Sequence, residues 1–373
     1  MKRASCLLLL GLVAATTGCA RRNRDVGVTP GPFDWSTLQG DVRRAGTEER
    51  SVPLDPEIAW KVDVGRGLRA EPLVHEGIVV VTGTNRLIAA YSAESGERFW
   101  EQRLNASVSG GLLWRNDTLW VATESLGGEI SARRLGKGGK YWEEDVGPAR
   151  FPPLLVGNTI YVGTDGGALI ALSALTGARQ WRTRLPGGAA ATPVPFGDDV
   201  VAIGGHDTLY VVAGADGRVL DRIALPAGAA AAPALAGDDL IVPLHNGSLV
   251  AVDLRLRELA WEASTGGEIL ATPIVAADGS VYALTTGGVV LRVPPNEERA
   301  EVLADLGGTA RGSLTLVRDG LLVGLLDGTL ALVQRDGATA WRRDLAGSIV
   351  APVAVWDGAI FVPLLDGKLA KLE

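Results

Sequence analysis

The sequence predicts an all-β protein: an eight-bladed β-propeller of four-stranded antiparallel blades, closed by an N-terminal strand. Two independent markers, a proline and a tryptophan, each recur along the 373 residues with a period of about 40 residues. Between them lie short apolar segments separated by glycine-containing turns, a pattern typical of strands joined by hairpins. Eight units with this period and this strand pattern predict a closed ring of blades.

The proline marker stands at the start of each expected inner strand. The segment "LPGGAAATPVPFGDD" at 185–199 returns as "LPAGAAAAPALAGDD" at 225–239. Proline costs little where no ladder hydrogen bond has begun, and the small residues before it let inner strands converge on the axis. The eight marker positions are Pro72, Gly111, Pro153, Pro193, Pro233, Pro273, Ser313 and Pro352.

The tryptophan marker falls in each expected outer strand. It occupies Trp60, Trp100, Trp142, Trp181, Trp261 and Trp341, with Asp221 and Glu301 at the two remaining positions. A buried indole removes about 150–250 Å² of surface from water. We therefore predict that the six tryptophans dock neighbouring blades, rather than stack on a sugar or a quinone.

Turn residues predict the hairpins inside each unit. The pairs Asp165-Gly166, Asn246-Gly247, Asp327-Gly328 and Asp366-Gly367 provide the positive φ angles of a two-residue turn between the second and third strands. Thr176-Gly177, Asp216-Gly217 and Asp336-Gly337 do the same before the fourth strand.

Closure of the ring follows from an incomplete last unit. After Pro352 there is room for only three strands before Glu373, while "EIAWKVDV" at 57–64 has the pattern of a fourth strand and carries Trp60. Pairing this segment with the last unit would remove both open sheet edges. The predicted propeller domain is 57–373.

The N-terminus indicates export. Residues 1–18 have a basic start and an apolar run too short for a permanent membrane helix, as in a signal peptide. The ending "TTGC" resembles a bacterial lipobox, which makes Cys19 the predicted lipidation site and 19–56 a linker and leader. Ala20 after Cys19 indicates the outer membrane, with the propeller facing the periplasm. An ordinary cleaved signal that releases a soluble protein is the alternative.

Composition excludes several classes of function. The net charge of −7 and the pI near 5.2 argue against nucleic-acid binding. The two cysteines, Cys6 and Cys19, both precede the propeller, so it has no disulfide. His75, His206 and His245 fall on different blades without metal-ligand spacing. The sequence predicts no catalytic residues and no metal site.

The repeat unit "IYVGTDGGALIALSALTGARQW" resembles the PQQ-like repeat, whose propellers carry a docking tryptophan in each blade. The segment "DWSTLQGDVRRAG" at 34–46 is similar to the leader that often precedes such propellers. Among exported lipoproteins of this size, the chain resembles the BamB family of scaffolds in the outer-membrane β-barrel assembly machinery. The resemblance implies a non-catalytic scaffold without a cofactor, a monomeric propeller, and an envelope protein partner, for which the β-barrel assembly machinery is the candidate.

The same repeat also occurs in PQQ-dependent dehydrogenases, which hold the quinone and calcium in the central funnel. Here the entrances of the fourth and fifth blades are almost entirely Ala and Gly, and these offer a calcium ion no side-chain oxygen. Glu71 is the one carboxylate immediately before a strand marker. A dehydrogenase, or another ligand-sensing propeller, is the alternative interpretation.

Four charged residues depart from the small, neutral entrances of the inner strands: Arg69, Glu71, Arg150 and Arg311. Three of them are cations on an acidic chain, and a local positive potential can steer an acidic loop or an anionic ligand. We predict that they form a partner-binding surface. The alternative is that they are solvated loop charges.

Overall fold

The structure is a computed structural model that describes residues 49–373, except 109, 125–126, 189–190, 205–206, 296 and 313. The predicted signal peptide, the lipidation site Cys19, the leader as far as residue 48, and the marker Ser313 lie outside the described residues. No helix in the described part of the chain has the length and apolar character needed to cross a membrane.

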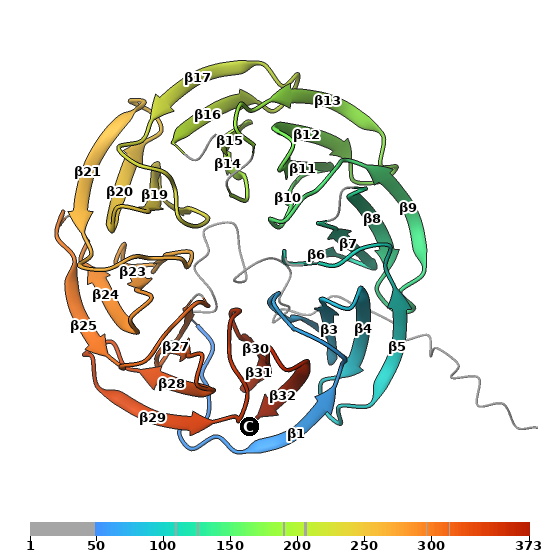
Figure 1. Cartoon of the computed structure of the whole chain (residues 1–373), viewed down its shortest axis with the longest axis vertical. Coiled ribbons are helices and arrows are strands. Elements are labelled where there is room, and N and C mark those ends of the chain that lie inside the picture. Colours follow the sequence, from blue (N-terminus) through green and yellow to red (C-terminus); the bar gives the residue numbers. More distant parts are fainter. Residues whose placement is uncertain are drawn as a thin grey trace, which may run out of the picture.

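The described residues form eight four-stranded antiparallel sheets arranged as a ring. Figure 1 looks down the axis of this ring, with the short inner strands near the centre and the long outer strands at the rim. Seven blades consist of four consecutive strands, and the eighth combines three C-terminal strands with the N-terminal one. The predicted fold class is confirmed.

The strands of the first four blades have the following bounds. Blade 1 is β2 (Leu73–His75), β3 (Ile78–Gly83), β4 (Leu87–Ser92) and β5 (Arg98–Arg103); blade 2 is β6 (Leu113–Arg115), β7 (Thr118–Ala122), β8 (Glu129–Arg134) and β9 (Lys140–Asp145). Blade 3 is β10 (Leu154–Val156), β11 (Thr159–Thr164), β12 (Ala168–Ser173) and β13 (Arg179–Arg184); blade 4 is β14 (Val194–Phe196), β15 (Asp199–Gly204), β16 (Thr208–Ala213) and β17 (Val219–Ala224).

The remaining blades follow in chain order. Blade 5 is β18 (Ala234–Ala236), β19 (Asp239–Leu244), β20 (Ser248–Asp253) and β21 (Glu258–Ser264); blade 6 is β22 (Ile274–Val275), β23 (Val281–Leu284), β24 (Val289–Val293) and β25 (Glu301–Asp305). Blade 7 is β26 (Thr315–Val317), β27 (Gly320–Gly324), β28 (Thr329–Val333) and β29 (Thr339–Asp344); blade 8 is β30 (Ala354–Trp356), β31 (Ala359–Pro363), β32 (Lys368–Leu372) and β1 (Ile58–Asp63).

Glycines set the turns that join the strands. Gly247 and Gly328 have φ angles of +78° and +96°, as the hairpin prediction requires. In blade 3 the prediction placed the positive φ at Gly166, but it falls one residue later, at Gly167 with φ +82°. The turn there contains two consecutive glycines, and either can adopt this conformation without a steric penalty.

The hydrophobic core lies between adjacent blades. One cluster joins Ile88 and Trp100 of blade 1 to Leu119 of blade 2, and the next joins Trp120 of blade 2 to Ile160 of blade 3. Because each sheet buries its faces against its neighbours, each blade depends on the blades beside it for its core.

The ring is closed by β1, which pairs antiparallel with β32. Trp60 lies opposite Lys371, and the backbone groups of Glu57 and Glu373 exchange hydrogen bonds of 2.9 and 3.1 Å. The predicted closing segment 57–64 therefore contains the strand that completes the last blade. With β1 in place, β32 is an interior strand of its sheet and no longer an edge strand.

Each outer strand contains a β-bulge. In blades 1 to 3 the register shifts between the third and fourth strands, so that Phe99, Tyr141 and Gln180 have no partner of their own. The marker tryptophan is the next residue in each case. A bulge bends the strand and redirects the following side chain, and here the redirected side chain is the indole that reaches the next blade.

Candidate partner-binding surfaces

The inner-strand entrances pack tightly against one another. A Cβ atom placed on Gly110 would lie 3.0 Å from the carbonyl oxygen of Arg150, and one placed on Gly312 would lie 3.2 Å from the carbonyl oxygen of Ala351. These contacts join the entrances of neighbouring blades. The small residues that repeat along the sequence are therefore required by the close approach of backbones.

The four predicted partner-binding residues lie at three separate entrances. Arg69 and Arg311 are exposed, at the entrances of blades 1 and 7. Arg150, at blade 3, donates two N–H groups to Asp165, with Nε–Oδ1 and Nη2–Oδ2 distances of 3.0 and 2.9 Å, and these hydrogen bonds raise the pKa of Arg150. Glu71 is only 4% exposed and lies beneath the surface. A contact surface here would depend on the three arginines, one of which is already paired.

The marker tryptophans donate hydrogen bonds across the blade boundaries. The indole N–H of each reaches the carbonyl of the first residue after the third strand of the next blade: Trp60 to Ala93 (3.3 Å), Trp100 to Leu135 (2.8 Å), Trp142 to Ala174 (3.2 Å) and Trp181 to Gly214 (2.9 Å). Trp341 donates instead to Pro53 in the segment before β1, at 3.1 Å. Trp261 packs, partly buried, against the cluster that joins blades 5 and 6.

At one marker position without tryptophan, an ion pair joins the neighbouring blades. Asp221 in blade 4 forms an ion pair with Arg257 in blade 5, with an Oδ2–Nη1 distance of 3.5 Å. The same place in the repeat thus joins neighbouring blades by two different kinds of contact.

The described residues form no recognisable site for the calcium ion that the dehydrogenases hold. Among them, no three His, Cys, Asp or Glu side chains gather where a metal ion could be held. Ca²⁺ takes six to eight oxygen ligands, and the entrance of blade 5 includes the buried alanines Ala229 and Ala232, whose side chains carry no oxygen. The described part of the entrances thus shows no cluster of ligands of the kind that calcium binding requires.

A groove of about 540 Å³ opens between blades 2 and 3, on the face opposite the inner-strand entrances. Trp120 and Trp142 line it, and both indoles donate to the carbonyl of Ala174, at 3.3 and 3.2 Å. Leu175 and Tyr141 at its rim are 71% and 47% exposed. The groove is lined further by Arg115, Asn116, Thr118 and Thr176.

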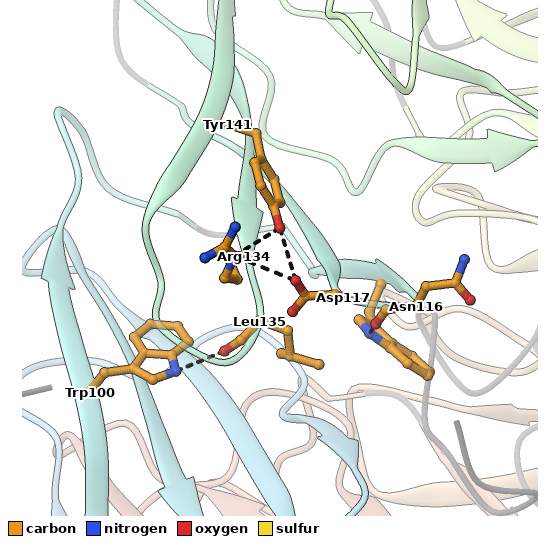
Figure 2. A network of polar contacts seen from close by, with 7 residues as sticks. Trp100, Asn116, Asp117, Arg134, Leu135 and Tyr141 are labelled. Atoms are coloured by element: carbon orange, nitrogen blue, oxygen red, sulfur yellow. Dashed lines mark hydrogen bonds and ion pairs between the residues drawn. The ribbon is translucent and has the colours of Figure 1, made fainter. Parts of the chain in front are cut away.

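A polar network holds Tyr141 in place at the rim (Figure 2). The tyrosine hydroxyl donates to Asp117 Oδ2 at 2.8 Å and accepts from Arg134 Nε at 3.0 Å, and the same Arg134 atom lies 3.5 Å from Asp117. The Arg134 guanidinium also lies 5.3 Å from the centre of the Tyr141 ring. Hydrogen bonds to charged groups on the first turn and third strand of blade 2 thus orient an exposed aromatic ring.

The sequence prediction did not include this groove. Ten tryptophans occur in the chain, and six follow the blade period. Trp114 and Trp120 fall out of phase, only six residues apart. Tryptophans outside the period are the signal that could have identified the region, because the fold does not require them at those positions.

The comparisons with known proteins decide the family. The family model described as "Outer membrane protein assembly factor BamB" matches residues 51–132 and 126–325. The chain belongs to this family. An outer membrane protein assembly factor BamB from Burkholderia pseudomallei is 32% identical over 150 residues, which cover 39% of this chain and 38% of that relative. The match thus spans well under half of that relative's length.

Solved structures show the same fold at low sequence identity. BamB from Moraxella catarrhalis has a TM-score of 0.72 at 15% identity, covering 86% of this chain and all of that one. A quinohemoprotein alcohol dehydrogenase from Pseudomonas putida has a TM-score of 0.76 at 12% identity, covering 92% and 80%. At these identities the likeness extends to the propeller only, and function has to be argued from the sites placed on it.

Proposed function

We propose that the chain is a non-catalytic scaffold in the assembly of outer-membrane β-barrel proteins. The observation that carries the proposal is the match of the BamB family model across residues 51–325, which include most of the ring. The Burkholderia relative bears the name of an outer membrane protein assembly factor.

The proposed location is the periplasmic side of the outer membrane, with a lipid on Cys19 and the propeller, as a monomer, attached through residues 19–56. Mass spectrometry of the mature N-terminus tests the anchor. A lipid-modified peptide that begins at Cys19 is expected. A free peptide beginning at another residue would remove the anchor from the proposal.

Crosslinking in intact envelopes tests the partner. Affinity purification of the tagged, crosslinked chain is expected to recover proteins of the β-barrel assembly machinery, and deletion of the gene is expected to lower outer-membrane barrel levels. Recovery of unrelated envelope proteins, with normal barrel levels in the deletion strain, would contradict the scaffold role.

The proposed contact surface is the cationic part of the inner-strand face, formed by Arg69, Arg150 and Arg311. The test is the triple variant Arg69→Glu, Arg150→Glu and Arg311→Glu, with binding to the recovered partner measured at low and high salt. Weaker binding and a smaller salt dependence are expected, because exposed charges act mainly through screened long-range attraction. Unchanged binding in a folded variant would move the contact elsewhere.

The dehydrogenase alternative has its own test. Purified protein is titrated with PQQ and calcium while absorbance is followed. No stoichiometric change is expected, because the described residues include no group of acidic side chains placed to hold the calcium ion. A saturable spectral change would overturn the non-catalytic interpretation.

A further inference from the structure

The groove between blades 2 and 3 differs from the equivalent interface between blades 1 and 2. The first two strands pair in the same way in blades 1 and 2. The residues of the groove can therefore be compared with the equivalent residues at the interface of blades 1 and 2. Strand pairing aligns Arg115 with His75, Thr118 with Ile78 and Trp120 with Val80, and the bulge aligns Tyr141 with Phe99. These four differences distinguish the interface from its neighbour, although an aromatic ring at the Trp120 position recurs as Tyr161, Tyr282 and Phe361 in blades 3, 6 and 8.

The differences from the interface of blades 1 and 2 make the base and the edge of the groove apolar. Trp120 replaces a smaller aliphatic residue at the base and is 2% exposed, while Leu175 stands 71% exposed at the edge. The ring of Tyr141 is held over the same opening by Asp117 and Arg134. A fixed aromatic ring beside an exposed leucine is suited to burying a large apolar side chain at small entropic cost.

The differences also place a cation beside this apolar surface. The Arg115 guanidinium lies 5.9 Å from the centre of the Trp120 ring. It donates to two neutral acceptors, the carbonyl of Gly157 and, at 3.1 Å, the Asn158 side chain. In the part of the chain that the structure describes, no carboxylate lies within ion-pairing distance of Arg115. A carboxylate on a bound molecule would form the charge-assisted hydrogen bonds that this guanidinium lacks.

The surrounding field limits how much negative charge the bound molecule can carry. The turns between the first and second strands, on the face that holds the groove, carry Glu76, Asp117, Asp198, Asp238 and Asp357. Such a face repels an anionic lipid surface or a polyacidic segment. A single carboxylate can still be favoured next to Arg115, because a short-range hydrogen bond is screened less than a long-range repulsion.

We propose that this groove binds an extended segment of a partner protein that presents an aromatic side chain next to one carboxylate. The aromatic side chain packs among Trp120, Tyr141 and Leu175, and the carboxylate accepts from Arg115. The site is separate from the inner-strand face of the proposed function, so either can fail without the other.

The test uses the folded chain with nitrogen-labelled indoles and the probe peptide acetyl-Ser-Phe-Asp-Ser-amide. Titration is expected to shift the indole signals of Trp120 and Trp142 along one saturable curve, and not that of Trp181. The matched peptide with Asn in place of Asp is expected to bind about fivefold more weakly, because a charged acceptor contributes more than a neutral one. The peptide with Ala in place of Phe is expected to show no saturation.

Two groove variants and two control variants sharpen the test. Arg115→Gln is expected to bind the Asp and Asn peptides equally, and Leu175→Ser to bind both more weakly. The controls are Arg255→Gln and Leu256→Ser, both in blade 5. Arg255 forms an ion pair with Asp238 at 2.8 Å, and Leu256 is 68% exposed. These controls are expected to bind the probe as the parent chain does.

Three results would overturn the proposal: no saturable shift of the two indoles, equal affinity of the parent chain for the Asp and Asn peptides, or equal weakening of binding by the control variants.

Binding of the groove to a membrane would also overturn the proposal, and vesicle sedimentation tests it. If the unlipidated chain sediments with vesicles of phosphatidylethanolamine and phosphatidylglycerol, and Leu175→Ser abolishes this, the groove is a membrane contact instead. If Arg115→Gln fails to fold, Leu175→Ser and the peptide series still decide the question.

Discussion

At the interface between blades 1 and 2, Trp100 is 1% exposed and donates its indole N–H to the carbonyl of Leu135 at 2.8 Å. At the interface between blades 2 and 3, Trp142 is half-buried and donates to Ala174 at 3.2 Å. The two tryptophans stand at the same place after the same bulge. The first indole is sealed by its neighbours, whereas the second forms part of a groove wall.

The difference comes from the residues around the indole. Ile78, Val80 and Leu135 cover the first interface and are at most 1% exposed. Their equivalents at the second interface are Thr118, Trp120 and Ala174. The threonine and the alanine fill less space and the tryptophan fills more, while Leu175 in the same turn is 71% exposed. The comparison shows that the docking tryptophan can be fully or only partly buried while the two blades remain packed together. A blade interface can therefore hold the ring together and also form a groove.

The largest expected effect on stability is that of removing the closing strand β1. Deleting residues 57–64 removes β1, with its ladder to β32 and the contact of Trp60 with Ala93. We expect a lower melting temperature and self-association, because the last blade then exposes a free strand edge. Thermal melts and light scattering measure both. A monomer with an unchanged melting temperature would contradict the role of β1 in closure.

The next effect separates the two interfaces directly. Trp100→Ala is expected to cost about 3–5 kcal/mol of unfolding free energy, as for a fully buried large side chain. Trp142→Ala is expected to cost roughly half as much, because less of its area leaves water on folding. Denaturant unfolding of both variants measures the difference. Equal costs would mean that the groove side of Trp142 is as well packed as the sealed interface.

A smaller effect concerns the tyrosine at the groove rim. Tyr141→Phe removes the hydroxyl that donates to Asp117, and the expected loss is about 0.5–1.5 kcal/mol. The matched change Phe99→Tyr is expected to gain no stability, because Gly77 stands where blade 2 has Asp117. Denaturant unfolding of the pair checks both values. A gain at position 99 comparable to the loss at 141 would show that the carboxylate is not needed.

The smallest effect separates stability from binding. Leu175→Ser is expected to change the unfolding free energy by no more than about 0.5 kcal/mol, since a mostly exposed side chain loses little on substitution. A thermal melt alongside the peptide titration checks this. A marked loss of stability would show that Leu175 belongs to the blade interface, and weaker peptide binding would then need another explanation.

Much of the fold could be predicted from the sequence because it follows from a period. The prolines before the inner strands and Trp60 in the closing segment occur at fixed places in the repeat, and one unit explains the others. The bulges could not be predicted in this way. They depend on a local register shift of one residue, which leaves the spacing of the tryptophans intact.

The sites were less predictable for a related reason. The exposed arginines at the entrances could be found because they break a neutral pattern, but the pairing of Arg150 with Asp165 and the burial of Glu71 depend on side-chain placement that spacing does not encode. The groove depends on Trp120 and Leu175, which come from different blades. The packing of neighbouring blades brings such residues together.

The pairing of β1 with β32 has a consequence for the order in which the ring is made. The first strand of the propeller to leave the ribosome is the last to find its partner, because β32 follows the seven intervening blades. Contacts this distant in sequence form late in folding, and extending the intervening chain adds only slowly to the entropy of closing it. Until then, β1 has free backbone groups and the indole of Trp60 is uncovered. A chain truncated before β32 therefore has an unpaired β-strand near its N-terminus. Chaperones and proteases can bind such an exposed strand in an incompletely folded protein.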